Sequence, residues 1–150
     1  MKVATLFRSI GARADVERYC PHLYTTMDDG SVQEAILDVV AVWPGLPVQH
    51  CIDVIIHSAF ATSLVDAASK PGIAALGGER QKRTRYGSSV LPFSMETLGR
   101  LGTASLDSLD HLSGLARTWG RVNGIQHWRR ALEHVVLWEL ADAAMLAVGQ

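Results

Sequence analysis

The chain has 150 residues, of which 48% are hydrophobic and 19% charged, and its formal net charge is −1. These values are typical of one globular domain with a single core, and they exclude a strongly basic protein that binds nucleic acid by its overall charge. Two cysteines exclude a disulfide framework, so we expect an intracellular, reducing compartment. No uninterrupted apolar run approaches the roughly 18 residues of a membrane span, so no membrane association is expected.

A short helix and a strand are the first elements expected along the chain. Apolar residues at helical spacing predict a helix over residues 3–12. Alternating apolar and polar residues predict a strand over residues 14–19, and Asp28-Asp29-Gly30 then predicts a turn.

Two buried strands are predicted next, over residues 34–43 and 48–57. Both runs are rich in Val and Ile, and the sequence Pro44-Gly45-Leu46-Pro47 between them is typical of a turn. The two runs therefore indicate a hairpin in the centre of the fold.

Each of these two strands contains one acid, Asp38 in the first and Asp53 in the second. A carboxylate in a buried strand is unfavourable unless it is paired or bound to a cation, and two carboxylates in adjacent strands repel each other. A shared divalent metal ion would account for both acids. Alternatively, each Asp lies at a strand end, accepts backbone N–H groups or faces solvent from an edge strand.

The next elements are a helix over residues 73–86 and a strand over residues 89–96. The second half of the helix is polar and basic, which suits contacts with the phosphate backbone of DNA but also suits a solvated helix face. The strand is expected at or near a sheet edge because Pro92 has no N–H to donate.

The C-terminal part is predicted to be helical, with helices over residues 103–122 and 126–148 that pack as an antiparallel hairpin. The expected fold class is therefore α/β (of the α+β type), with a small mixed sheet of about four strands in the order α-β-β-β-α-β. We expect one domain over residues 1–150, with its core in about 1–100 and a helical extension over about 103–148.

This order of elements, with acids in successive central strands, is the layout of the PD-(D/E)XK restriction-like nucleases. More specifically, the chain resembles the restriction-like endonuclease region at the C-terminal end of reverse-transcriptase polyproteins of non-LTR retrotransposons. The resemblance covers roughly residues 10–120, and it depends on the segments 35–40, 51–56, 82–86 and 90–99.

The resemblance implies hydrolysis of a DNA phosphodiester that depends on Mg²⁺ (or Mn²⁺) and nicks a target strand to prime reverse transcription. Asp38 and Asp53 would be the metal ligands, because hard cations prefer oxygen donors. Lys82 would orient the nucleophile or neutralise charge in the transition state. The sequence departs from the simple motif, because Ile55 stands where the lysine two positions after Asp53 is expected. The resembling endonucleases often carry this lysine on the following helix, where Lys82 lies.

Further candidates complete the expected site. Glu17, on the first predicted strand, is either a third catalytic carboxylate or an exposed partner for a neighbouring arginine. The residues expected to bind nucleic acid are those of the basic helix, namely Arg80, Lys82, Arg83, Arg85 and Tyr86.

Three functions remain open at this point. The first is the endonuclease, with DNA as its partner and a nuclear location when it acts on DNA. The second is a non-catalytic nucleic-acid-binding or assembly module of the same fold. The third is an unrelated α/β protein that forms oligomers through its C-terminal helices. The zinc knuckle and polymerase that usually precede this endonuclease are missing, so the chain resembles a detached piece of a reverse-transcriptase polyprotein. The remainder of that polyprotein and a second copy of the chain are therefore further expected partners.

Overall fold

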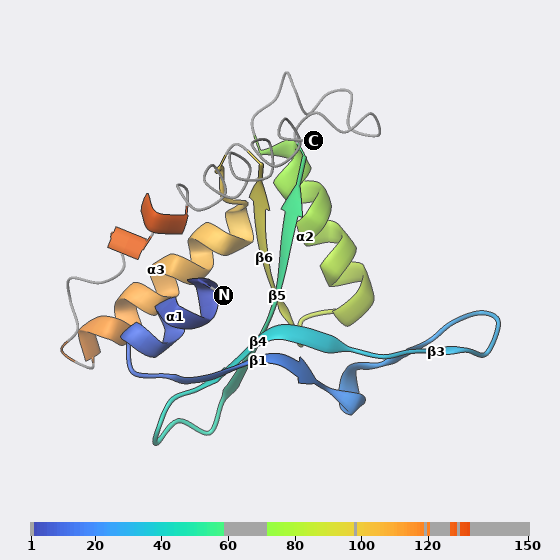
Figure 1. The fold of residues 1–150 in the computed structure, drawn as a ribbon, viewed down its shortest axis with the longest axis horizontal. Coiled ribbons are helices and arrows are strands. Elements are labelled where there is room, and N and C mark those ends of the chain that lie inside the picture. Colours follow the sequence, from blue (N-terminus) through green and yellow to red (C-terminus); the bar gives the residue numbers. More distant parts are fainter. Residues whose placement is uncertain are drawn as a thin grey trace, which may run out of the picture.

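The computed structural model describes residues 2–58, 72–97, 99–118, 120, 127–128 and 130–132. Along the chain its elements are α1 (Lys2–Ser9), β1 (Arg13–Tyr19), the 3₁₀ helix η1 (Pro21–Leu23), β2 (Thr25–Thr26), β3 (Val32–Gln33), β4 (Ile36–Val42), β5 (Gln49–His57), α2 (Ile73–Tyr86), β6 (Leu91–Glu96) and α3 (Thr103–Thr118) (Figure 1).

Four strands form one mixed sheet in the order β1-β4-β5-β6. The pairs β1–β4 and β4–β5 are antiparallel, whereas β5 and β6 are parallel and are connected through α2. The expected mixed α/β fold class is confirmed. A second, two-stranded sheet of β2 and β3 was not expected, and the predicted turn at Asp28-Asp29-Gly30 lies between its strands.

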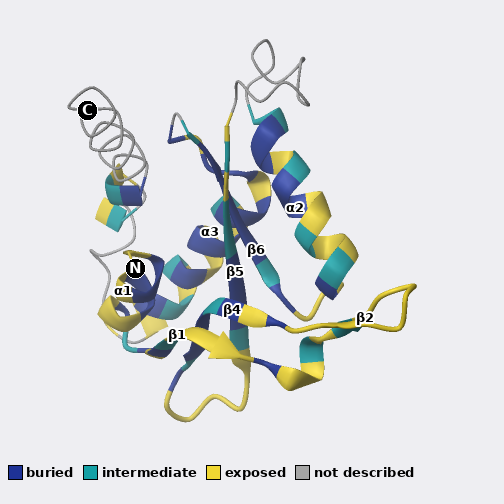
Figure 2. Ribbon diagram, turned by 45° about the vertical axis from the view of Figure 1, so that its right-hand side comes forward, coloured by how far each residue is buried: buried dark blue, intermediate teal, exposed yellow. Residues whose placement is uncertain are grey.

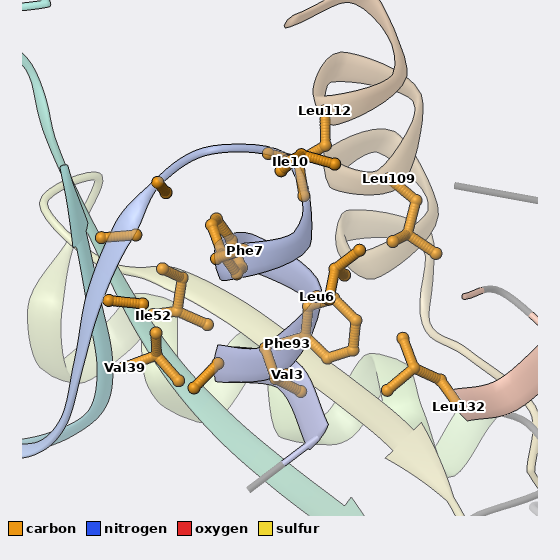
Figure 3. Close-up of a cluster of buried hydrophobic side chains, with 14 of the residues drawn as sticks. Val3, Leu6, Phe7, Ile10, Val39, Ile52, Phe93, Leu109, Leu112 and Leu132 are labelled. Atoms are coloured by element: carbon orange, nitrogen blue, oxygen red, sulfur yellow. The ribbon is translucent and has the colours of Figure 1, made fainter. Parts of the chain in front are cut away.

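The helices lie on both faces of the four-stranded sheet. Helices α1 and α3 cover one face and α2 covers the other (Figure 1 and Figure 2). Helix α1 forms because its apolar residues recur at helical spacing, which directs Val3, Leu6 and Phe7 to one side. Figure 3 shows Phe7 packed between the sheet and α3, whose Leu109 and Leu112 also face the core.

The edge position of β6 agrees with the expectation from Pro92, since β6 is the last strand of the sheet. Helix α3 occupies most of the predicted range 103–122. The second helix of the predicted C-terminal hairpin, over 126–148, lies mostly outside the described residues. Within the part that the structure describes, no helix has the length and apolar character needed to cross a membrane.

Two buried glutamates hold α2 in place between β6 and α3. The Ala74 N–H, in the first turn of α2, donates to Glu96 Oε1 of β6 at 3.2 Å. The Ala104 N–H, in the first turn of α3, donates to Glu79 Oε1 of α2 at 2.8 Å. Carboxylates are stabilised at helix N-termini because the first N–H groups there have no partner inside the helix. These two contacts fix the position of α2, which carries the basic residues.

Adjacent glycines in α2 have different environments. A Cβ atom built on Gly78 would lie 2.6 Å from His57 Cδ2 and 2.8 Å from Ile55 Cγ2, both of β5, whereas one built on Gly77 meets no atom within 4 Å. Because glycine has no Cβ atom, Gly78 allows α2 to lie closer to β5 than any other residue type at this position would allow.

We predict opposite effects on stability for alanine at these two positions. Gly78→Ala should lower the free energy of unfolding by about 1–3 kcal/mol, because the new methyl group forces α2 away from β5. Gly77→Ala is the matched control, and it should raise that free energy by up to ~1 kcal/mol, because alanine favours the helix without a clash. Urea denaturation of both variants measures the difference, and equal changes in both would contradict the close packing.

Candidate catalytic site

Neighbouring strands bring the two strand acids together. Val39 of β4 lies opposite Ile52 of β5 in antiparallel register, so Asp38 and Asp53 follow as the next facing positions. Their carboxyl groups share a hydrogen bond. This hydrogen bond is one of the causes that raise the pKa of Asp38, because the protonated form of Asp38 can donate to Asp53.

Asp38 also interrupts the regular pairing of β4. Its Oδ2 accepts a hydrogen bond of 2.7 Å from the Val54 N–H, so a side chain replaces a backbone acceptor beside β5. Leu37 and Val40 belong to the same buried cluster, although residues three apart face opposite sides of a regular strand. Across from Asp38 in β1, Glu17 has a φ of 50°, in the left-handed region. Irregularities of this kind redirect side chains next to functional sites.

Lys82 of α2 reaches the acid pair from the helix that covers this face of the sheet. Its Nζ lies 2.7 Å from Asp53 Oδ2, and the two side chains are only 18% and 6% exposed. The helix can deliver this ammonium group because Gly78, one turn earlier, lets α2 pack closely on β5. Lys82, expected from sequence to lie near the acids, is therefore in direct contact with one of them.

Tyr86 lies one turn after Lys82, on the same side of α2. It is buried, and its phenol lies close enough to Asp53 for the charge of that carboxyl group to act on it. Burial is the main cause that raises the pKa of this phenol, and the nearby Asp53 charge raises it further. Tyr86 therefore keeps its phenolic proton at neutral pH. It was expected to bind nucleic acid, but its burial leaves little of the ring open to such a contact.

The acid pair has an unusual protonation equilibrium. Burial is the largest cause that raises the pKa of Asp38 to about 6, and the hydrogen bond and the charge of Asp53 raise it as well. The Val54 N–H and the Lys82 ammonium group act in the opposite direction and favour the carboxylate. Near neutral pH, the Asp38 proton is therefore held weakly enough to be displaced by a cation.

The donor set suits a hard cation. Mg²⁺ is commonly bound by one or two carboxylates, with substrate phosphate and water oxygens at its other positions. Asp38 and Asp53 provide such a pair of carboxyl groups, and the proton on Asp38 occupies the position that a cation would take. Among the described residues, no group of three His, Cys, Asp or Glu side chains could hold a metal ion. Glu17 is exposed and does not complete the pair.

The residues of α2 that were predicted to bind nucleic acid differ in their surroundings. Lys82 and Tyr86 face the acids, whereas Arg80 and Arg83 are exposed. Arg85 is half-buried, and its Nη2 donates to the Glu34 carbonyl oxygen at 2.8 Å, which connects α2 to the chain before β4. The structure thus leaves Arg80 and Arg83 as the predicted residues that are open to a phosphate backbone.

Sequence reasoning gave no role to Val54, whose N–H orients Asp38, and it did not foresee that Tyr86 is buried next to Asp53. The spacing of four residues between Lys82 and Tyr86 was the available signal, because it places both on one side of a helix. No protein-family model, curated protein or solved structure matches this chain. The interpretation of the site therefore depends on its own geometry.

Proposed function

We propose that this chain is a metal-dependent DNA endonuclease domain that hydrolyses a phosphodiester and nicks a target strand. The observation that supports this function best is the meeting of Asp38, Asp53 and Lys82 on one face of a mixed sheet. Two hard oxygen donors beside a lysine are a suitable combination for binding a divalent cation and a phosphate together.

Each residue has a separate part in this proposal. Asp38 and Asp53 would hold Mg²⁺ or Mn²⁺, which when bound supplies Lewis-acid activation of water and of the phosphate oxygens. The Val54 N–H keeps Asp38 oriented toward β5, and the buried phenol of Tyr86 packs beside Asp53 and shields it from water. The Lys82 ammonium group, next to Asp53, would stabilise the negative charge that develops on the phosphate.

The surroundings of the site suit a nucleic-acid substrate. Arg80 and Arg83 are exposed on the helix that carries Lys82, where they can contact phosphates on either side of the cleaved bond. Such contacts add salt-dependent affinity without reading the base sequence. We further propose, from the resemblance of the sequence, that this domain belongs to a retroelement polyprotein and acts in the nucleus.

Nicking of supercoiled plasmid in the presence of Mg²⁺ tests the proposal. Wild-type protein should convert the plasmid to the open circle, and Asp53→Asn should reduce the rate by about a hundredfold or more. Asp28→Asn, a change of the same kind at an exposed position in the turn between β2 and β3, should retain the wild-type rate. Absence of nicking by wild-type protein, or equal nicking by Asp53→Asn, would contradict the proposal.

A non-catalytic nucleic-acid-binding module of the same fold is the second candidate. Two observations favour it. Among the described residues, no third metal-binding side chain lies next to Asp38 and Asp53, and Lys82 already neutralises the charge of Asp53. This candidate predicts DNA binding that weakens with salt and is equal in wild-type protein and Asp53→Asn, with no cleavage by either. The plasmid assay combined with a binding measurement distinguishes the two functions.

A further inference from the structure

A cavity of about 380 Å³ lies at the edge of the sheet where β6 begins. This volume is within the range of pockets that bind small organic groups, roughly 300–1,000 Å³. Its apolar floor includes Phe7, Val90, Leu91 and Leu112. Its polar rim includes Arg83, Ser88, Ser89 and Asp107, all of them exposed. An apolar floor with a polar rim suits a flat ring with hydrogen-bonding edges.

The cavity exists because β6 is shorter than β5 at this end of the sheet. The β5–β6 ladder begins where Ile52 faces Leu91, so the first residues of β5 have no strand beside them on that side in the described part of the molecule. His50 and Cys51 point to opposite faces of β5, yet both line the cavity. The cavity therefore lies in the line of β6, between α2 and α3.

Two histidines lie next to each other in the lining of the cavity. The rings of His50 and His111 have centroids 6.1 Å apart, and Trp43 packs edge-on against His50 with centroids 4.9 Å apart. Burial, followed by the proximity of His111, lowers the pKa of His50. His50 is thus a neutral imidazole at pH 7, with one nitrogen that donates and one that accepts a hydrogen bond. A nucleobase presents both kinds of group on its edge and a flat face for stacking.

The cavity adjoins the candidate catalytic residues through three neighbouring positions. Cys51 precedes Asp53 by two residues, which is roughly 7 Å along a strand. Arg83 follows Lys82 directly in α2, and Pro92 lies opposite Asp53 in β6. A base that enters the cavity therefore belongs to a nucleotide close to the phosphate at the acid pair.

We propose that this cavity receives one unpaired base of the DNA strand whose phosphate lies at Asp38, Asp53 and Lys82. The preferred substrate is then DNA with an unpaired nucleotide beside the cleavage point, and continuous duplex is cleaved more slowly. This inference rests on the proposed endonuclease function and specifies its substrate. A base inside a perfect duplex must first leave the stack, which costs free energy that an unpaired base does not require.

DNA binding without metal tests the inference separately from cleavage. Fluorescence anisotropy in EDTA would compare a perfect duplex, the same duplex with one extra unpaired nucleotide, and that bulged duplex with an abasic residue at the unpaired position. Wild-type protein should bind the bulged DNA about tenfold more tightly than the other two, because only this DNA offers a free base. The abasic DNA keeps the same backbone, so it separates recognition of the base from recognition of the bend.

Two histidine variants make the test specific to the cavity. His111→Ala changes an exposed residue of the cavity and should remove the preference for bulged DNA. His22→Ala, at an exposed position in η1, should retain it. Equal binding of all three DNAs by wild-type protein, or an unchanged preference in His111→Ala, would overturn the inference even if the plasmid is nicked. A preference for bulged DNA that depends on His111 supports the cavity as a site for an unpaired base. If this preference appears without nicking of the plasmid, the result contradicts the proposed catalysis and not the base-binding site.

Discussion

Replacing Lys82 with Met should lower the free energy of unfolding by about 3 kcal/mol at pH 7. Methionine retains much of the length and packing of the side chain but removes its charge. The Asp53 side chain, 6% exposed, then has no cation within contact distance among the described residues, while Asp38 remains beside it. A buried carboxylate that loses its ion-pair partner is one of the most costly single changes in a protein interior.

The loss of stability in Lys82→Met should depend on the pH and on the presence of Asp53. The pKa of Asp38 is raised to about 6, and protonation of Asp38 removes the repulsion between the two carboxyl groups. The difference between wild-type protein and Lys82→Met should therefore diminish as the pH falls through 6. Adding Asp53→Asn to Lys82→Met should restore part of the stability, so the two changes are not additive.

Urea denaturation of the four members of this cycle, at pH 7 and at pH 4.5, measures both effects. Arg80→Met is the matched control, since Arg80 is exposed on the same helix, and it should change the stability by no more than about 0.5 kcal/mol. If Lys82→Met behaves like Arg80→Met at both pH values, then Lys82 does not neutralise a buried charge.

Asp38→Asn should make the protein more stable at neutral pH while abolishing its Mg²⁺-dependent activity. The amide retains an oxygen that accepts from the Val54 N–H, and its NH₂ group can donate to Asp53 in the place of the shared proton. Because the repulsion between two carboxylates disappears, we expect a gain on the order of 1–2 kcal/mol, which allows for partial solvent screening. A gain in stability with loss of function is the usual sign of a strained functional site.

The sign of the pH dependence follows from the pKa of Asp38. This pKa is raised to about 6 in the folded protein, so the folded state holds the Asp38 proton more tightly than the unfolded chain does. The stability that Asp38 contributes is therefore fully present below pH 4 and is lost as the pH rises through 6. The advantage of Asp38→Asn should grow over that interval and become constant above about pH 7.

Thermal unfolding between pH 4 and pH 8 measures this advantage, with Asp28→Asn as the control at an exposed aspartate. Mg²⁺ should raise the unfolding temperature of wild-type protein at pH 7.5 more than at pH 5, because a bound cation must displace the shared proton. Asp38→Asn should show no such response. An advantage that does not change with pH would mean that the two carboxyl groups do not interact.

Much of the fold could be predicted because its elements depend on local patterns. The β-branched runs around Asp38 and Asp53 became β4 and β5, and the predicted helix over residues 73–86 agrees with α2 at both ends. The β2–β3 pair was missed because each strand has only two residues and lacks an alternating apolar pattern. Such short strands depend on their turn and on each other, which a search for periodicity does not detect.

The sequence by itself determined the mixed α/β class, the positions of Asp38 and Asp53 in buried strands, and the basic character of α2. These features follow from the spacing and chemistry of neighbouring residues. Only the tertiary structure decided that Lys82 and Tyr86 face the acids while Arg80 and Arg83 face solvent, and that Glu17 stays outside the site. The physical reason is that strand register and the close packing of α2 at Gly78 join residues far apart in the chain, and these contacts have no local sequence signal.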